Sequence, residues 1–322
     1  MKIVDERIRR VLSASGDGSD WSEDLKRLER GDTTLTRKSA GEATIKAVQR
    51  LLVFLGYSTA SSGAFLIDGD FGRGTNRGVA QFQFEYGLNS RISHKHLCYP
   101  CSFQNARSRI TAVPDVKFDL PTLDKMLAVT VDAIGSKMIA FGDFDEALFH
   151  LNSLEQRRAL NCRQILEHYG VAVQQAVERV NNETGVVIQP AWVLAIIKQE
   201  TSGIARPRFE QHKLSSRSSG YPATPFSELR IQSMSIGLGQ IMGFNYKQVG
   251  AVSAQAMLYS PLTEQVLFVA RFIAKKRGVV AKTSPTLADF SKMARYYNGP
   301  AYEKHFYHER LQRWFREFRL LM

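Results

Sequence analysis

The sequence predicts a mainly α-helical protein with two domains, a small one in the first half and a larger one in the second. The length of 322 residues leaves room for two cores. Apolar residues recur in both halves at the three- and four-residue spacing of amphipathic helices. The net charge of +12 is divided unevenly, because the residues from Pro190 onwards hold 19 Lys and Arg against 8 Asp and Glu. A strongly basic half indicates a polyanionic partner.

A polar N-terminal arm (1–40) is expected to precede the first domain (41–132). In that domain a helical apolar stripe runs from Ile45 to Leu55. A tight turn around Gly69 follows, and Thr75 is the expected N-cap of a second helix. A third short helix is expected at 115–127, after an insertion at 89–114.

This first domain resembles the three-helix peptidoglycan-binding domain found on bacterial and phage cell-wall hydrolases. The motifs that carry the resemblance are VQRLLVFLGY (48–57), DGDFGRGT (68–75) and VAQFQFEYGL (79–88). The resemblance implies that peptidoglycan is the partner of this domain. A three-helix spacer that binds nothing is the alternative.

The insertion holds the run SHKHLCYPC, which contains four residues of metal-ligand type. His94, His96, Cys98 and Cys101 could close a tetrahedral zinc site, although the run would have to fold back tightly. We favour a solvated loop with free thiols, or a Cys98–Cys101 disulfide, over a metal site. The odd count of 3 cysteines gives no reason to expect a disulfide framework.

The second domain (154–322) is expected to follow a linker (133–153), and its central helix begins at Pro190. On a helical wheel Glu200 shares the face of Val193, Ile196 and Ile197. A carboxyl group on an apolar face is expected to have a raised pKa and so to retain a proton near neutral pH. The alternative is a surface glutamate that pairs with a lysine at the end of the helix.

Four motifs in one order carry a second resemblance, to a phage-type N-acetylmuramidase family related to goose-type lysozymes and lytic transglycosylases. They are KQETSG (198–203), RFEQH (208–212), SIGLGQIMGFN (235–245) and RYYNGP (295–300). The resemblance implies a helical lysozyme-like domain that cleaves the β-1,4 bond between N-acetylmuramic acid and N-acetylglucosamine. It implies Glu200 as the acid and assigns substrate contacts to Thr201, His212, Gln240, Tyr297 and Asn298.

The second catalytic group is open at this point. Glycoside hydrolysis needs a base or nucleophile besides the acid, and Glu210 is the leading candidate. A bracing pair of Glu210 and His212 is the alternative, and Asp289 reads as a helix cap. Without a second carboxylate, the 6-hydroxyl of the substrate would attack and give a 1,6-anhydro product, as in lytic transglycosylases.

No cofactor is expected, and nucleic acid is not an expected partner because no helix-turn-helix or zinc-finger pattern occurs. Arginines at 310, 313, 316 and 319 predict a basic amphipathic C-terminal helix, for which contact with anionic membrane or lipopolysaccharide is an alternative to internal packing. The N-terminus has no secretory signal and no apolar run is long enough to span a bilayer, so we expect synthesis in the cytoplasm. We also expect a monomer. It would reach the periplasm or cell wall by holin-type release, as an endolysin, or by injection, as an antibacterial effector. A non-catalytic wall-binding protein is the rival outside the enzyme class.

Overall fold

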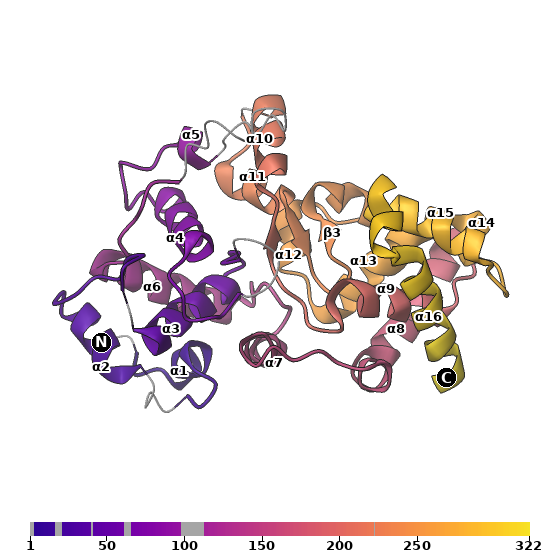
Figure 1. Cartoon of the computed structure of the whole chain (residues 1–322), viewed down its shortest axis with the longest axis horizontal. Helices are drawn as coiled ribbons and strands as arrows, with labels where there is room; N and C mark the ends of the chain where they lie inside the picture. Colours follow the sequence, from indigo (N-terminus) through magenta and orange to yellow (C-terminus); the bar gives the residue numbers. More distant parts are fainter. Residues whose placement is uncertain (1–2, 17–20, 40, 61–65, 98–112, 222) are drawn as a thin grey trace. The chain divides into compact units, whose positions relative to one another are not determined.

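The computed structural model describes the chain except residues 1–2, 17–20, 40, 61–65, 98–112 and 222, and the described part is mainly helical, as predicted (Figure 1). Its contacts divide it into two compact units. The first unit comprises residues 1–157, 206–235 and 242–244, and the second comprises 158–205, 236–241 and 245–322. The chain therefore returns to the first unit between Ala205 and Ile236.

The helices of the first unit follow the sequence pattern closely, with differences at their ends. Helices and strands lie at α1 (Glu6–Leu12), α2 (Ser22–Glu29), α3 (Glu42–Phe54), α4 (Arg73–Glu85), α5 (His94–Leu97), α6 (Leu120–Ser136), α7 (Phe144–Glu155), β1 (Arg208–Phe209), α10 (Gln211–Gly220) and α11 (Phe226–Gln232). Helix α4 begins at Arg73 after Gly72, so Thr75 is not its N-cap. Instead the Thr75 hydroxyl donates to the Asp70 carbonyl at 3.0 Å and closes the turn.

Two buried arginines hold the first unit together. Arg50 on α3 donates to Glu155 on α7 at 2.6 Å and to the Val11 carbonyl at 2.7 Å. The segment 133–153, expected to be a linker, thus contains the end of α6 and most of a packed helix. Arg230 on α11 lies 2.5 Å from Glu85 and donates to the Gly56 carbonyl at 2.9 Å. These contacts explain why residues 206–235 belong to this unit.

The second unit is built around α9, which is buried from Ala191 to Ile197. Its elements are α8 (Cys162–Thr184), α9 (Pro190–Thr201), α12 (Ala254–Leu258), α13 (Leu262–Ala274), α14 (Arg277–Val280), α15 (Leu287–Asn298), η3 (Pro300–His305) and α16 (Tyr307–Leu321). Trp192 packs against Phe290 and Phe315, with ring centroids 4.7 and 4.8 Å away. Helix α8 runs unbroken through Gly170.

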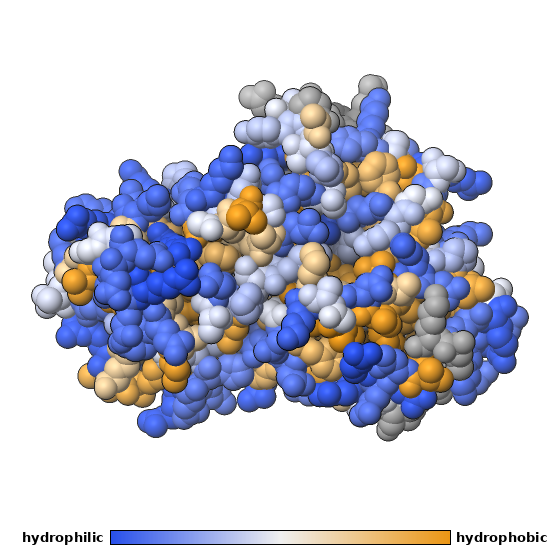
Figure 2. Space-filling view, turned by 180° about the vertical axis from the view of Figure 1, so that it is seen from behind, coloured by the Kyte–Doolittle hydropathy of each residue, from blue (hydrophilic) through white to orange (hydrophobic). Residues whose placement is uncertain are grey.

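The chain crosses between the units at short strands. Strands β2 (Met234–Ile236) and β3 (Ile241–Met242) join β1 in a sheet of order β1-β2-β3, and η2 (Gly243–Val249) follows. Strands β1 and β2 are antiparallel, with Arg208 opposite Ser235. Within the described residues, no helix is both long enough and apolar enough to cross a membrane. The face drawn in Figure 2 has hydrophilic and hydrophobic residues interspersed.

Candidate active site

Glu200 lies in the last turn of α9, where the buried helix reaches the surface of its unit. Pro190 occupies the first turn of α9, and Ser202 ends the helix in the left-handed conformation with φ of 49°. Residues Ala191 to Ile197 are buried, whereas Lys198, Gln199 and Glu200 are partly exposed. The Tyr307 hydroxyl donates a hydrogen bond to Glu200 Oε1. The carboxyl group therefore points to a protein partner and not into open solvent.

Tyr307 reaches Glu200 because the chain turns sharply just before α16. Phe306 adopts the left-handed conformation with φ of 52° and separates η3 from α16. Tyr307 is 4% exposed. Burial, followed by the charge of Glu200, raises the pKa of the Tyr307 phenol well above its usual value. The phenol thus stays protonated, as a donor must. Sequence reasoning missed this residue, whose only signal was its place at the end of the tyrosine-rich segment after α15.

A glycine-containing turn lies beside the end of α9, formed by residues 237–240. The buried Thr201 hydroxyl donates to the Leu238 carbonyl at 2.9 Å. The Tyr297 hydroxyl donates to the Gly239 carbonyl at 2.6 Å. A Cβ at Gly239 would lie 2.7 Å from the Tyr297 oxygen, so only glycine permits this approach. Two predicted substrate-binding residues therefore fix the turn.

Gln240 ends this turn in a conformation that is uncommon for its residue type. Its φ is 50°, and its side-chain amide donates to the Gly237 carbonyl at 3.0 Å. Non-glycine residues in the left-handed region cluster at functional sites. Burial and the charge of Glu200 raise the pKa of Tyr297 well above its usual value, which relates this ring to Glu200 electrostatically. Asn298 is the last residue of α15 and is exposed.

Glu210 and His212 belong to the first unit and lie around the start of α10. Glu210 Oε1 lies 3.0 Å from Arg208 Nε, and Glu210 Oε2 lies 3.7 Å from His212 Nδ1. Burial lowers the pKa of Arg77 to about 10, and the charge of Glu210 opposes that shift. Glu210 therefore lies close to Arg208, His212 and Arg77.

Asp289 has the capping role that the sequence suggested. It forms a capping box with Thr286 at the start of α15, and Lys282 Nζ lies 2.6 Å from its carboxylate. Burial alone would raise the pKa of Asp289, but hydrogen bonds from Lys282 and Thr286 outweigh the effect of burial and lower this pKa to about 2. Asp289 is 1% exposed, so its environment is that of a structural group.

The suggested metal ligands are only partly described. His94 and His96 lie on α5, and the Ser93 backbone N–H donates to His96 Nδ1 at 3.1 Å. Cys98 and Cys101 lie outside the described residues. Among the residues with described positions, no group of three or more His, Cys, Asp or Glu could hold a metal ion.

Two family comparisons match separate parts of the chain. Residues 227–319 match the N-acetylmuramidase family, and residues 41–90 match a family of peptidoglycan-binding domains. The chain is therefore a modular peptidoglycan hydrolase. It joins an N-terminal wall-binding domain to a C-terminal muramidase domain, and its enzyme class is that of lysozyme-like glycoside hydrolases. Gln240, Tyr297 and Tyr307 lie inside the muramidase match, whereas Glu200 precedes it.

The structure comparison gives a weaker likeness. The crystal structure of a Burkholderia AP3 phage endolysin aligns with a TM-score of 0.35 and 17% sequence identity, over 90% of this chain and 99% of that chain. No curated protein matches the chain.

Proposed function

We propose that Glu200 is the general acid that cleaves the β-1,4 bond between N-acetylmuramic acid and N-acetylglucosamine. The observation that carries this proposal is the hydrogen bond from the buried Tyr307 phenol to Glu200. A general acid must be held in one orientation to pass its proton to the leaving oxygen. Tyr307 restrains the carboxyl, and the turn at 237–240 is restrained through Thr201 and Tyr297.

Substrate contacts follow from this arrangement. We assign contacts with the hydroxyl or N-acetyl groups of the sugar to Gln240 and Asn298. Gln240 is the last residue of the restrained turn, and Asn298 follows Tyr297, whose hydroxyl anchors that turn. Thr201 and Tyr297 act chiefly by fixing the turn, because their hydroxyls already donate to backbone carbonyls. Glu210 is the proposed second carboxylate, with His212 as its neighbour.

A lytic transglycosylase reaction is the second candidate. The observation that favours it is the ion pair between Glu210 and Arg208, because a carboxylate bound in this way is poorly available to activate water. In that reaction Glu200 protonates the leaving oxygen and becomes a carboxylate. The 6-hydroxyl of the muramic acid then attacks the anomeric carbon, and the Glu200 carboxylate takes the proton of that hydroxyl.

Product mass separates these reactions. Purified peptidoglycan is digested with the full chain, and the released muropeptides are analysed by mass spectrometry. Hydrolysis predicts reducing ends on all products, which borohydride reduces. Products lighter by one water, and resistant to reduction, would replace the hydrolase proposal with the transglycosylase.

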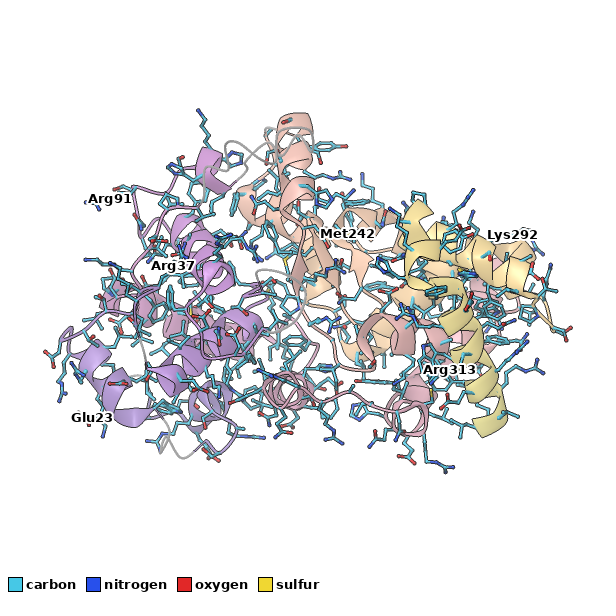
Figure 3. The ribbon with its side chains drawn as sticks, in the orientation of Figure 1. Glu23, Arg37, Arg91, Met242, Lys292 and Arg313 are labelled. Atoms are coloured by element: carbon cyan, nitrogen blue, oxygen red, sulfur yellow. The ribbon has the colours of Figure 1, made fainter. Side chains whose placement is uncertain are left out.

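We propose that the protein acts as an endolysin or an injected effector, as a monomer that needs no cofactor. It would be made in the cytoplasm and released to the periplasm or wall by a separate protein. The basic face of α16 supports contact with an anionic membrane or lipopolysaccharide, since Arg310, Arg313, Arg316 and Arg319 are exposed on it. Figure 3 labels Arg313 on this helix. Lysis of permeabilised cells by the purified chain, with the Glu200→Gln variant inactive, excludes the non-catalytic rival. DNA binding that vanishes at moderate salt would be incidental.

A further inference from the structure

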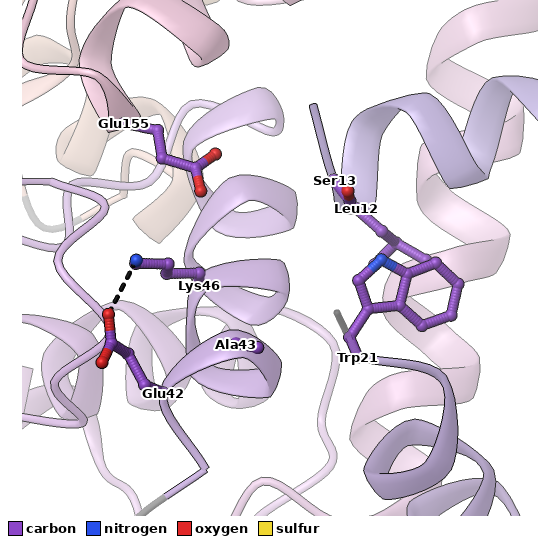
Figure 4. A pocket seen from close by; sticks show the side chains of 7 residues that line it. All are labelled: Leu12, Ser13, Trp21, Glu42, Ala43, Lys46 and Glu155. Carbon is purple, nitrogen blue, oxygen red and sulfur yellow. Dashed lines mark ion pairs between the residues drawn. The ribbon is translucent and has the colours of Figure 1, made fainter. Parts of the chain in front are cut away.

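The three tryptophans of the chain differ in what their indole nitrogens contact. Trp21 lines a small cavity of the first unit (Figure 4), and Trp192 lies in the core of the second unit. Both of these indole nitrogens are buried with no hydrogen-bond partner among the described residues. Trp314 on α16 is only partly buried, yet its indole nitrogen donates to Gln199 Oε1 at 3.2 Å. Gln199 immediately precedes Glu200, so this tryptophan contacts the turn of α9 that bears the proposed acid.

The last turn of α9 is held from one side by the segment that precedes α8. Because the last carbonyls of a helix have no partner within it, helix ends fray unless other groups bind them. Lys198 Nζ donates to the Leu160 carbonyl at 2.6 Å, and the Leu160 backbone N–H donates to the Ser202 carbonyl at 3.0 Å. These two bonds fix the backbone at the end of α9, whereas the Glu200 side chain is held by a different element.

Helix α16 holds the same turn of α9 through two side chains on one of its faces. Tyr307 and Trp314 are seven residues apart, which is almost two full turns of a helix. Tyr307 donates to Glu200, and Trp314 donates to Gln199. Lys198 Nζ also lies 5.2 Å from the centroid of the Trp314 ring, within the range of a cation–π contact. Trp314 therefore contacts the two residues that come directly before Glu200.

The packing of α16 does not depend on the Trp314 hydrogen bond. Phe315 packs against Trp192 of α9, with ring centroids 4.8 Å apart, and against Phe290, at 5.4 Å. This aromatic contact holds α16 on the buried part of α9. A phenylalanine in place of Trp314 would thus keep an aromatic ring beside Lys198 and lose the N–H donor.

We propose that Trp314 is a positioning residue for the general acid. Its hydrogen bond to Gln199 keeps a fixed distance between the last turn of α9 and α16, so that the Tyr307 phenol meets the Glu200 carboxyl in one geometry. Loss of the bond leaves the acid in place but less precisely oriented, which slows proton transfer without weakening substrate binding. This inference rests on the proposed role of Glu200 as the proton donor.

The test compares two substrates of the full chain. Soluble glycan strands of peptidoglycan need a proton on the leaving oxygen, whereas an oligosaccharide with a nitrophenol leaving group does not. We expect Trp314→Phe to lower kcat on the glycan strands about threefold to tenfold, the usual effect of one hydrogen bond between neutral groups, with KM unchanged. Its kcat on the nitrophenyl substrate should equal that of the parent, because a defect in proton donation does not affect this leaving group.

Trp192→Phe is the matched control, because it makes the same change where the indole nitrogen has no partner in the described part of the chain. It should lower Tm and leave the ratio of the two kcat values unchanged. Gln199→Met removes the acceptor and should reproduce the effect of Trp314→Phe. The double variant of Trp314→Phe and Gln199→Met should lose no more than either single variant, since both changes delete one hydrogen bond.

Three results would overturn the positioning role. They are equal losses on both substrates in Trp314→Phe, losses that multiply in the double variant, and an unchanged kcat in both single variants. Glu200→Gln is measured beside them, to separate this inference from the assigned acid. If Glu200→Gln loses equally on both substrates, the assignment of the acid is wrong. If it loses only on the glycan strands while Trp314→Phe does not, the positioning role alone is wrong.

Discussion

Glu200 and Glu210 lie ten residues apart in the chain, but in different motifs and in different compact units. Glu200 ends a buried helix of the second unit and accepts from a neutral phenol. Glu210 precedes α10 in the first unit and lies 3.0 Å from an arginine. A phenol orients a carboxyl group through a hydrogen bond, whereas a guanidinium adds an attraction between opposite charges. The contrast supports the proposal that Glu200 is the proton donor.

Loss of the acid should have the largest effect. Glu200→Gln keeps the side-chain shape and removes the proton, so wall hydrolysis should fall about 10²- to 10⁴-fold, the usual contribution of general acid catalysis. The rate of muropeptide release measures this. The control is Glu167→Gln, an exposed change on α8 that should retain the parent rate. A fall of similar size in both variants would show that folding, not proton transfer, was affected.

Removal of the phenol should have the next largest effect. Tyr307→Phe leaves the packing and deletes the donor to Glu200, so kcat should fall roughly tenfold with little change in KM, since the hydrogen bond orients the acid and does not touch substrate. Tyr296→Phe is the control, because that hydroxyl donates to the Phe272 carbonyl instead. An unchanged kcat for Tyr307→Phe would remove Tyr307 from the account.

A smaller effect is expected at the turn. Thr201→Val deletes the donor to the Leu238 carbonyl and should lower the free energy of unfolding by about 1–2 kcal/mol, with a loss of a few-fold in kcat. Thermal unfolding and initial rates measure the two changes. Thr263→Val, an exposed change on α13, serves as the control. If Thr201 contacted the sugar directly, KM would rise while stability stayed constant.

Substitution of the Asp289 carboxylate should lower stability and leave kcat unchanged. The folded pKa of Asp289 is about 2, below its ordinary 3.8, so its charge stabilises the fold above about pH 4, and that stabilisation is lost as the pH falls towards 2. Asp289→Asn should therefore lower the free energy of unfolding by about 1–2 kcal/mol at pH 7, with a gap that narrows below about pH 4. Asp132→Asn, an exposed change on α6, should show no gap. Reduced kcat in Asp289→Asn without lost stability would place Asp289 in catalysis.

Patterns among neighbouring residues predicted the helices of the site better than the contacts between segments that are far apart in the sequence. Pro190 and the residues up to Ile197 predicted α9. Tyr307 was missed because its contact depends on the left-handed turn at Phe306, which the sequence does not mark with glycine. The placement of residues 206–235 depends on Arg230 pairing with Glu85, 145 positions away, and no local pattern reports that contact. The predicted domain boundaries and site roles stay predictions.

The most direct test of Glu200 as a proton donor compares two leaving groups. Peptidoglycan expels a sugar alkoxide that needs a proton, whereas a soluble oligosaccharide with a nitrophenol leaving group does not. Glu200→Gln should lose about 10²-fold or more against peptidoglycan and stay within a few-fold of the parent on the nitrophenyl substrate. Equal losses on both substrates would contradict Glu200 as the general acid.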